Sequence, residues 1–381
     1  MHRIPGLDLL RAVAILSVMC THAWIAGGMG YGFGWIQDDG WMGVDLFFVL
    51  SGYLIGRQLL LRYQRTGKVD LKTFYRQRAY RILPAYLAML ALLFLIPTLR
   101  EQAAMQPMWQ FLTFTMNLLI DPSRLHTFSS AWSLCVEEHF YLVFPLMVTV
   151  MAPGASVKRV LAVLFGLMLA GLAWRGFAWW QSAAPSNDGS GVLDMNLRRY
   201  MALIYYPTYA RLDGLLCGVG LAILNVYRPS LWQRLQRHAN ALALAGCVTV
   251  TVAAWLFQDI LTFAACTVGF PILSFGLALL VAAAASPDGA LARIRLPGIR
   301  WIATISYSLY LCHKAVLKLA WTHLPDALSH RGTLTFMCCA LAAFAAAALL
   351  HYLVERPFLR LRDRGQWKAT ALRAREAGDA A

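Results

Sequence analysis

The sequence predicts an all-α integral membrane protein, built as a ten-helix transmembrane bundle with both termini in the cytoplasm. The first observation is composition, because 59% of the 381 residues are hydrophobic and only 14% are charged, whereas soluble chains carry about 25% charged residues. The second is that the apolar residues form long blocks, each near the roughly 20 residues that a helix needs to cross a bilayer. The third is that lysine and arginine cluster in the gaps between these blocks, which is the signature of cytoplasmic loops.

The apolar blocks give the order of the expected helices. They cover residues 7–26, 43–61, 82–98, 131–151, 158–180, 210–226, 239–257, 262–285, 301–321 and 333–354. A further stretch, residues 108–120, is too short to cross comfortably and is expected to be re-entrant or interfacial. No small-residue cleavage site follows the first block, so we expect it to stay as a span. We assign residues 1–363 to one transmembrane domain and residues 364–381 to a short basic cytoplasmic tail.

The positive charges orient the bundle. With the N-terminus inside, 23 lysines and arginines fall in segments expected inside and five in segments expected outside, which favours this orientation. The net charge of +15 therefore reports topology, and we expect no nucleic-acid partner. The eight cysteines lie in apolar segments without a CxxC pair, so we interpret them as small buried hydrophobic residues.

The first block carries two ionisable residues, Arg11 and His22, in the stretch LDLLRAVAILSVMCTHAW. Eleven residues are about 20° more than three helical turns, so both side chains share a face, roughly 16 Å apart along it. Charged groups inside a membrane are costly and are functional candidates. Histidine is the usual general base near neutral pH; a histidine wetted at a helix end is the alternative. Asp8, one turn before Arg11, is expected to neutralise it.

The second and fourth blocks begin at the outer face in the predicted topology and bring carboxylates to the level of His22. Their sequences are GVDLFFVLSGYLIG, with Asp45, and AWSLCVEEHFYLVFPL, with Glu137 and Glu138. A carboxylate at this depth could orient His22, and we assign this role to Glu137, although a helix-to-helix hydrogen bond fits it too. Which of Glu137 and Glu138 is functional stays open. For Asp45, a catalytic role and a helix-capping role fit equally well.

The third block starts with FYRQRAYRILPAY, which places Arg76, Arg78 and Arg81 at the inner mouth of its helix. One interpretation is a topology signal or a contact with anionic lipid. The other is an anion site for a phosphorylated cytosolic donor, because arginine matches phosphate geometry. The residue types favour neither.

The sixth and ninth blocks supply candidate substrate contacts. ARLDGLLCG brings Arg211 and Asp213 in from the outer side, and ISYSLYLCHKAV places Ser306, Tyr310 and His313 on one face at i, i+4 and i+7. A packed interior stripe is as consistent with this spacing as a pocket wall. We predict that Tyr310, His313, Arg211 and Asp213 contact the substrate.

Several familiar motifs do not occur in the sequence. It contains no Walker loop, no Rossmann glycine pattern, no HExxH and no G-x-S-x-G. We therefore expect no internal ATP site, no metal and no serine nucleophile of the hydrolase type.

Taken together and in order, these motifs resemble the membrane-bound acyltransferase-3 family over nearly the whole chain. RAVAILSVMCTH fits the family's arginine-ten-residues-histidine motif. The others are GVDLFFVLSGYLI, RAYRILPAY, WSLCVEEHFY, RLDGLLCG, SYSLYLCH and VERPF. The resemblance implies ten spanning helices and transfer of acyl groups, often acetyl from acetyl-CoA, to hydroxyls of sugars and other acceptors. It implies that Arg11 and His22 are the motif pair, with His22 the essential base, and that Glu137 holds the family's WSLxxE carboxylate position.

The expected function is therefore that of an acyl-CoA-dependent O-acyltransferase in the bacterial inner membrane. The donor nucleotide would stay at the basic inner mouth, Arg11 would bind the donor's arm, and a carbohydrate or small-molecule hydroxyl would meet His22 from outside. Some family members append an extracytoplasmic hydrolase-like domain; this chain ends in a basic tail, so we expect it to act alone or with a separate partner. The acceptor, the acyl group, the oligomeric state and an acyl-enzyme intermediate stay open.

The alternative from another functional class is a multi-pass transporter or flippase for a glycolipid or sugar unit. Polar groups gathered at one membrane depth suit such a protein equally well. A membrane scaffold would explain the hydrophobicity but not the register of Arg11 and His22.

Overall fold

The computed structural model describes residues 3–30, 33–102, 104–120, 127–151, 156–185, 193–325, 328 and 331–364. Within them, eight helices are long and apolar enough to cross a membrane, or up to nine if a bent pair of helices counts as one span. The protein is thus a helical, multi-pass membrane protein. Ten spans and the cytoplasmic location of both termini stay predictions. Arg124, one of the five arginines expected on the outer side, and the predicted tail beyond Arg364 lie outside the described residues.

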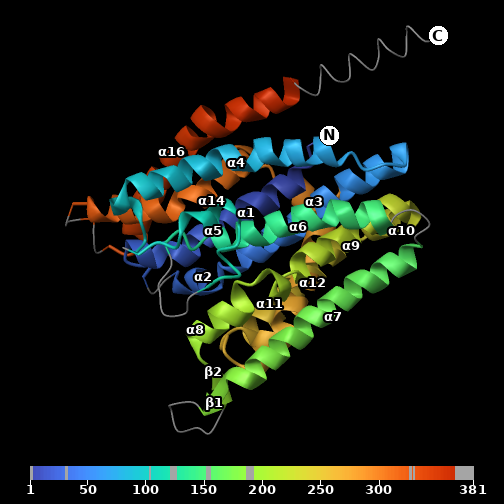
Figure 1. The fold of residues 1–381 in the computed structure, drawn as a ribbon, viewed down its shortest axis with the longest axis horizontal. Helices are drawn as coiled ribbons and strands as arrows, with labels where there is room; N and C mark the ends of the chain where they lie inside the picture. The colour runs from blue at the N-terminus through green and yellow to red at the C-terminus, as the bar shows by residue number, and fades with distance from the viewer. Residues whose placement is uncertain are drawn as a thin grey trace.

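The first half of the bundle consists of long helices joined by short segments. In chain order these are α1 (Pro5–Thr21), the 3₁₀ helix η1 (His22–Ala26), α2 (Gly34–Asp39), α3 (Met42–Thr66), α4 (Leu71–Leu95), η2 (Pro97–Leu99), α5 (Met108–Leu112), α6 (Ala131–Met151) and α7 (Val157–Ser182). In Figure 1, α4 and α16 lie along one long edge of the molecule and α7 along the opposite edge, with α1 and α3 between them.

The second half starts with a short antiparallel ribbon in which Ala183 pairs with Met195. The elements are β1 (Ala183–Pro185), β2 (Leu193–Met195), α8 (Leu197–Tyr200), the π-helix η3 (Met201–Tyr205), η4 (Thr208–Ala210), α9 (Asp213–Tyr227), α10 (Pro229–Arg237), α11 (Ala239–Leu256), η5 (Ala265–Gly269), α12 (Phe270–Ala284), α13 (Ala290–Arg293), α14 (Ile299–Thr322), α16 (Thr333–Leu350) and η6 (His351–Glu355).

The helices match the predicted blocks with one informative difference. Helix α4 begins at Leu71 rather than at residue 82, because the side chain of Asp70 caps it by accepting from the amide of Thr73 at 3.0 Å. Residues 108–120 form only the five-residue helix α5 followed by turns, so this stretch does not cross the bundle.

Helices α3 and α9 pack closely at small residues. A Cβ atom on Gly52 would collide with the carbonyl of Leu215, and one on Gly218 with the carbonyl of Val49. Such glycines allow two backbones to approach within the membrane. This contact sets the beginning of α3 against the residues just before α9, where two charged side chains meet.

One end of the bundle gathers the start of α1, the first half of α14 and η6. Arg3 donates to the Thr304 hydroxyl at 2.7 Å. Glu355 of η6 accepts from Ser308 at 2.8 Å and pairs with Arg81 of α4. The first helix therefore begins at the end of the bundle where the last one finishes, as the topology prediction requires.

Candidate active site

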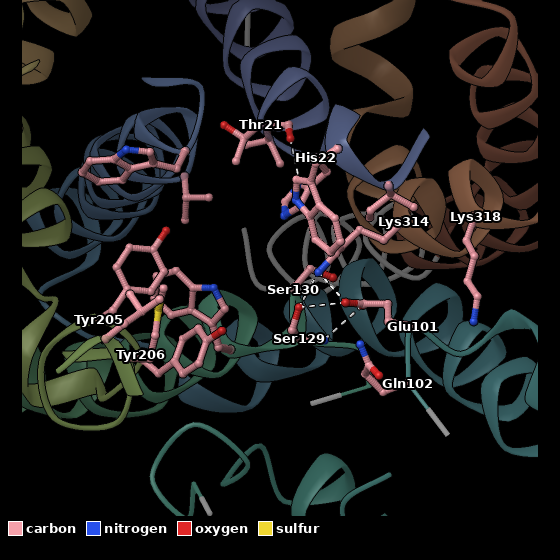
Figure 2. A pocket seen from close by; sticks show the side chains of 18 of the residues that line it. Thr21, His22, Glu101, Gln102, Ser129, Ser130, Tyr205, Tyr206, Lys314 and Lys318 are labelled. Carbon is pink, nitrogen blue, oxygen red and sulfur yellow. Dashed lines mark hydrogen bonds and ion pairs between the residues drawn. The ribbon is translucent and has the colours of Figure 1, made fainter. Parts of the chain in front are cut away.

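A cavity of about 850 Å³ opens beside His22; we call it the His22 cavity. It lies between η1, the second half of α14, the segment after α4 and the α8–η3 segment (Figure 2). Its polar lining includes Thr21, His22, Glu101, Gln102, Ser129, Ser130, Arg198, Lys314 and Lys318. Its aromatic lining is Trp24, Trp41, Trp132, Tyr200, Tyr205, Tyr206, Tyr310 and Trp321. This size and this mixture of polar and apolar groups are typical of a small-molecule site.

The His22 ring lies where α1 tightens into η1. Its Nδ1 atom is 2.8 Å from the carbonyl oxygen of Val18 and 3.1 Å from Nε2 of His313. A carbonyl oxygen can only accept, so Nδ1 carries the hydrogen and Nε2 of the neutral ring has a free lone pair. Among the described residues, Nε2 of His22 has no hydrogen-bonding partner. The ring thus offers a proton acceptor at the cavity wall.

Glu137 lies away from His22, so the predicted carboxylate–imidazole contact is wrong. Its Oε1 accepts from the Ser51 hydroxyl at 3.0 Å, and its Oε2 accepts from the Tyr141 hydroxyl at 2.7 Å. The prediction placed Glu137 in the outer half of its helix, and in α6 it lies six positions after Ala131, about 9 Å along the axis; its hydroxyl partners there come from α3 and from α6 itself. His22 instead has a partner from α14, His313.

Asp45 and Arg211 form a buried ion pair with each other. The guanidinium donates to both carboxylate oxygens at 2.8 and 2.9 Å, and the two side chains are at most 4% exposed. The guanidinium also lies 4.2–5.1 Å from the ring centres of Trp132, Tyr205 and Phe270. Neither charged residue lines the cavity, so the predicted contacts of Asp45 with the base and of Arg211 with substrate are not found. The pair supports Trp132 and Tyr205, which do line it.

Tyr205, which lines the His22 cavity, stays uncharged near neutral pH. Burial raises the pKa of the Tyr205 phenol to about 12, and the positive charge of Arg211 opposes that rise. Tyr205 therefore presents a hydroxyl that can donate or accept a hydrogen bond.

Asp213, another predicted substrate contact, is also held in a buried ion pair. Arg175 of α7 donates to its two carboxylate oxygens at 2.7 and 3.2 Å and to the carbonyl of Ala210 at 2.6 Å. Sequence reasoning missed Arg175. The signal was available, because an arginine in the middle of an apolar span requires a buried partner.

A second cavity, of about 150 Å³, contains Arg11; we call it the Arg11 cavity. Its charged lining is Arg11, Arg78, Arg81, Glu137 and Glu138, joined by the hydroxyl residues Ser51, Ser133, Tyr141, Ser306, Tyr307 and Tyr310. Arg11 lies 3.8 Å from Asp8, as expected, and keeps 36% of its side chain exposed. Arg11 and Arg81 each have a carboxylate partner outside this lining, Asp8 and Glu355 respectively.

The predicted cluster of three arginines divides in the structure. Arg78 and Arg81 line the Arg11 cavity, whereas Arg76 is exposed and does not. Positions three apart share a helix face, but positions two apart diverge by about 200°. Arg78 also reaches Gln58, at 3.4 Å, and Arg81 pairs with Glu355. The candidate anion site therefore keeps two of the three predicted arginines.

Two residues, Val44 and Tyr310, line both cavities. The Tyr310 hydroxyl lies 2.5 Å from the hydroxyl of Ser133, so this hydrogen bond stands between the two spaces. The sequence placed Arg11 and His22 at two depths of one face, and in the structure they line two adjoining cavities.

The predicted stripe on α14 follows both cavities. Ser306 lines the Arg11 cavity and Tyr310 lines both. His313 is fully buried and bonds to His22 rather than lining either space.

Lys314 and Glu101 form a charged wall of the His22 cavity that sequence reasoning missed. The Lys314 ammonium pairs with a Glu101 oxygen at 2.5 Å and donates to Ser129, whose hydroxyl also bonds to Glu101 at 3.1 Å (Figure 2). A lysine inside an apolar block was the available signal.

Comparison with known proteins decides the family. A family model described as an acyltransferase domain matches residues 4–353. The chain belongs to the acyltransferase-3 family. No solved structure matches it significantly.

Curated relatives of this acyltransferase-3 protein bear related names. It is 30% identical over 341 residues to the putative peptidoglycan O-acetyltransferase YrhL of Bacillus subtilis, covering 84% of this chain and 49% of the relative. It is 26% identical to the peptidoglycan O-acetyltransferase OatA of Listeria monocytogenes (83% and 50%) and 25% identical to the O-acetyltransferase OatA of Staphylococcus aureus (82% and 50%). The chain therefore spans about half the length of the curated relatives it matches.

Proposed function

We propose that the protein is a membrane O-acyltransferase that moves an acyl group, acetyl in the first instance, from acyl-CoA to a hydroxyl group of a carbohydrate. The observation that carries the proposal is the free Nε2 of His22 at the wall of an 850 Å³ cavity. This cavity adjoins a second one lined by three arginines. A base at an acceptor site and cations at a donor site are what such a transfer needs.

Arg11, Arg78 and Arg81 are proposed to bind the donor. Guanidinium groups bind phosphates by paired hydrogen bonds, and the buried Nε atom of Arg78 has no hydrogen-bond partner within the part of the chain that the structure describes. A space of about 150 Å³ is too small for a nucleotide but suits a narrow chain. The pantetheine arm of acyl-CoA would thread it, leaving the phosphates at its open side and carrying the thioester to Tyr310.

His22 is proposed to act as the general base. The acceptor hydroxyl donates its proton to Nε2 while its oxygen attacks the thioester carbonyl. The tetrahedral intermediate then collapses, the C–S bond breaks, and the leaving thiolate takes the proton from Nε2. General acid–base catalysis of this kind contributes about 10²–10⁴-fold. Transfer through an acyl-histidine would use the same nitrogen as a nucleophile.

The acceptor is proposed to be a saccharide of the cell envelope, with peptidoglycan first. The names of the relatives support this class. The lining supports it too, since eight aromatic side chains offer flat faces to sugar rings and the hydroxyl and charged groups offer hydrogen bonds to sugar hydroxyls.

The transporter hypothesis predicts a different assay result. Purified protein in lipid nanodiscs would receive radiolabelled acetyl-CoA with and without peptidoglycan fragments. The enzyme releases free thiol and labels the saccharide only when both substrates are present. Saccharide movement across a vesicle membrane without thiol release would refute the enzyme and support transport. His238→Ala, which removes an exposed histidine at the end of α10, is the matched control for His22→Ala.

A further inference from the structure

The buried histidine His313 has one ring nitrogen committed to its own helix. Its Nδ1 lies 2.9 Å from the carbonyl oxygen of Tyr310 and 3.1 Å from that of Leu309. Both oxygens can only accept, so this nitrogen carries a hydrogen. In the neutral ring, Nε2 of His313 is then an acceptor.

That acceptor points at His22. The distance from His313 Nε2 to His22 Nδ1 is 3.1 Å, and the ring centres are 5.0 Å apart with the planes inclined at 54°. The Nδ1 hydrogen of His22 therefore faces two acceptors, the carbonyl of Val18 within its own helix and the imidazole of His313 from α14.

The reverse arrangement does not fit these contacts. If His313 donated from Nε2, then Nδ1 of His22 would have to be bare. A bare nitrogen would face the Val18 carbonyl oxygen at 2.8 Å, lone pair against lone pair. The geometry thus selects a neutral pair in which both Nδ1 atoms are protonated and Nε2 of His22 is free.

We propose that His313 is a positioning residue that, together with the Val18 carbonyl, holds the His22 ring in the orientation and tautomer in which Nε2 can take a proton. The inference rests on the proposed function, because it assumes that His22 is the base. When Nε2 gains the acceptor's proton, Nδ1 keeps its hydrogen and goes on donating it to His313. The buried imidazole thus takes the place in which serine hydrolases use a carboxylate, without adding a negative charge to the site.

The location of His313 agrees with this role. It is 0% exposed and lines neither cavity, so it has no direct route to either substrate. Leu309 and Tyr310 lie inside α14, where their carbonyls already have amide partners, so the Nδ1 contacts add little to the helix. Their effect is to fix the ring so that Nε2 faces His22.

Two substitutions separate positioning from packing. In His313→Gln the side-chain amide oxygen can reach the place of Nε2, whereas in His313→Asn the shorter side chain ends near Nδ1. We expect His313→Gln to keep kcat within about threefold of wild type and His313→Asn to lose about 10²-fold, the lower end of acid–base catalysis. The KM for acetyl-CoA should stay within about twofold in both variants, since a lost interaction made in the transition state lowers kcat alone.

A spectroscopic measurement on the unmodified chain tests the geometry without relying on turnover. The nine histidines are labelled with ¹⁵N in their rings, and the His22 signals are identified by their loss in His22→Ala. Solid-state NMR in lipid should show a protonated Nδ1 and an unprotonated Nε2 for His22, with a hydrogen-bond correlation from Nδ1 to His313. His313→Asn should remove that correlation, while the Val18 carbonyl keeps Nδ1 protonated.

The outcomes distinguish the two proposals. A protonated Nε2 on His22 in wild type, or His313→Asn with wild-type kcat, overturns the positioning role. If His22→Ala keeps full turnover while the unmodified chain gives the expected NMR spectrum, His22 is rejected as the base and the hydrogen-bonded pair stands.

Discussion

Substitution of Arg211 by methionine removes both hydrogen bonds that its guanidinium donates to Asp45, while a long apolar side chain remains among the aromatic rings. Asp45 is then a carboxylate 2% exposed without a counterion. Breaking a buried pair in this way costs about 3–5 kcal/mol. At about 2 °C per kcal/mol for a large chain, the melting midpoint in detergent should fall by roughly 6–10 °C. Tryptophan fluorescence would report it, with the exposed Arg199→Met as the matched control.

The double variant Asp45→Leu with Arg211→Met decides whether the pair is structural. Replacing both charges with apolar groups of similar volume is often neutral, so the midpoint should return to within about 3 °C of wild type and acetyl transfer should persist. An unchanged midpoint in the single variant would refute the stabilising role. A folded double variant without transfer would show that Asp45 takes part in the chemistry, as the sequence suggested.

Three other predictions follow from the donor site and the topology. The double variant Arg78→Gln with Arg81→Gln should raise the KM for acyl-CoA about 10–100-fold, the range for lost hydrogen bonds to charged groups, with little change in kcat. The control Arg76→Gln should leave KM unchanged. An equal rise of KM in that control would mean that the arginines act only through general surface charge. Arg11→Ala should weaken binding of acyl-CoA in isothermal titration and Arg11→Lys should restore it only in part, because lysine lacks the guanidinium fork; full restoration would mean that charge alone suffices. Reporters fused after Ala381 should be active only as cytoplasmic reporters, and a periplasmic signal would invert the assignment of the donor and acceptor sides.

The helices were predictable because a membrane-spanning segment is recognisable from its own residues, as a long apolar block. Long apolar blocks gave the long helices within a few residues at most ends. The larger error, the early beginning of α4, came from Asp70, whose cap lets a helix continue through a basic, solvated stretch. Helix α9 has only 15 residues, and α14 carries Lys314 and Lys318, so neither is among the eight described helices that are long and apolar enough to cross a membrane on their own.

The site was predictable in part. Helical periodicity placed Arg11 and His22 on one face, and they line adjoining cavities. The partners of buried charges were not predictable, because depth in the membrane does not specify which helices are neighbours. Glu137 was therefore assigned to His22, although its hydrogen bonds go to Ser51 and Tyr141.

His313 illustrates the same limit. Its spacing indicated a wall of a pocket, and only the packing of α14 against η1 shows that its ring bonds to the base. Tertiary contacts between distant segments carry this information, and periodicity along one helix does not.

The most direct test of the central claim compares donor binding and turnover in His22→Ala. Isothermal titration with a non-hydrolysable acyl-CoA should give near-normal affinity, because the arginines that bind the donor are unchanged. Acceptor-dependent thiol release should be lost, since removal of a base removes an interaction made in the transition state. The His238→Ala control should match wild type in both. Full turnover by His22→Ala would contradict the account, and loss of donor binding would place the thioester's binding site, rather than the base, at His22.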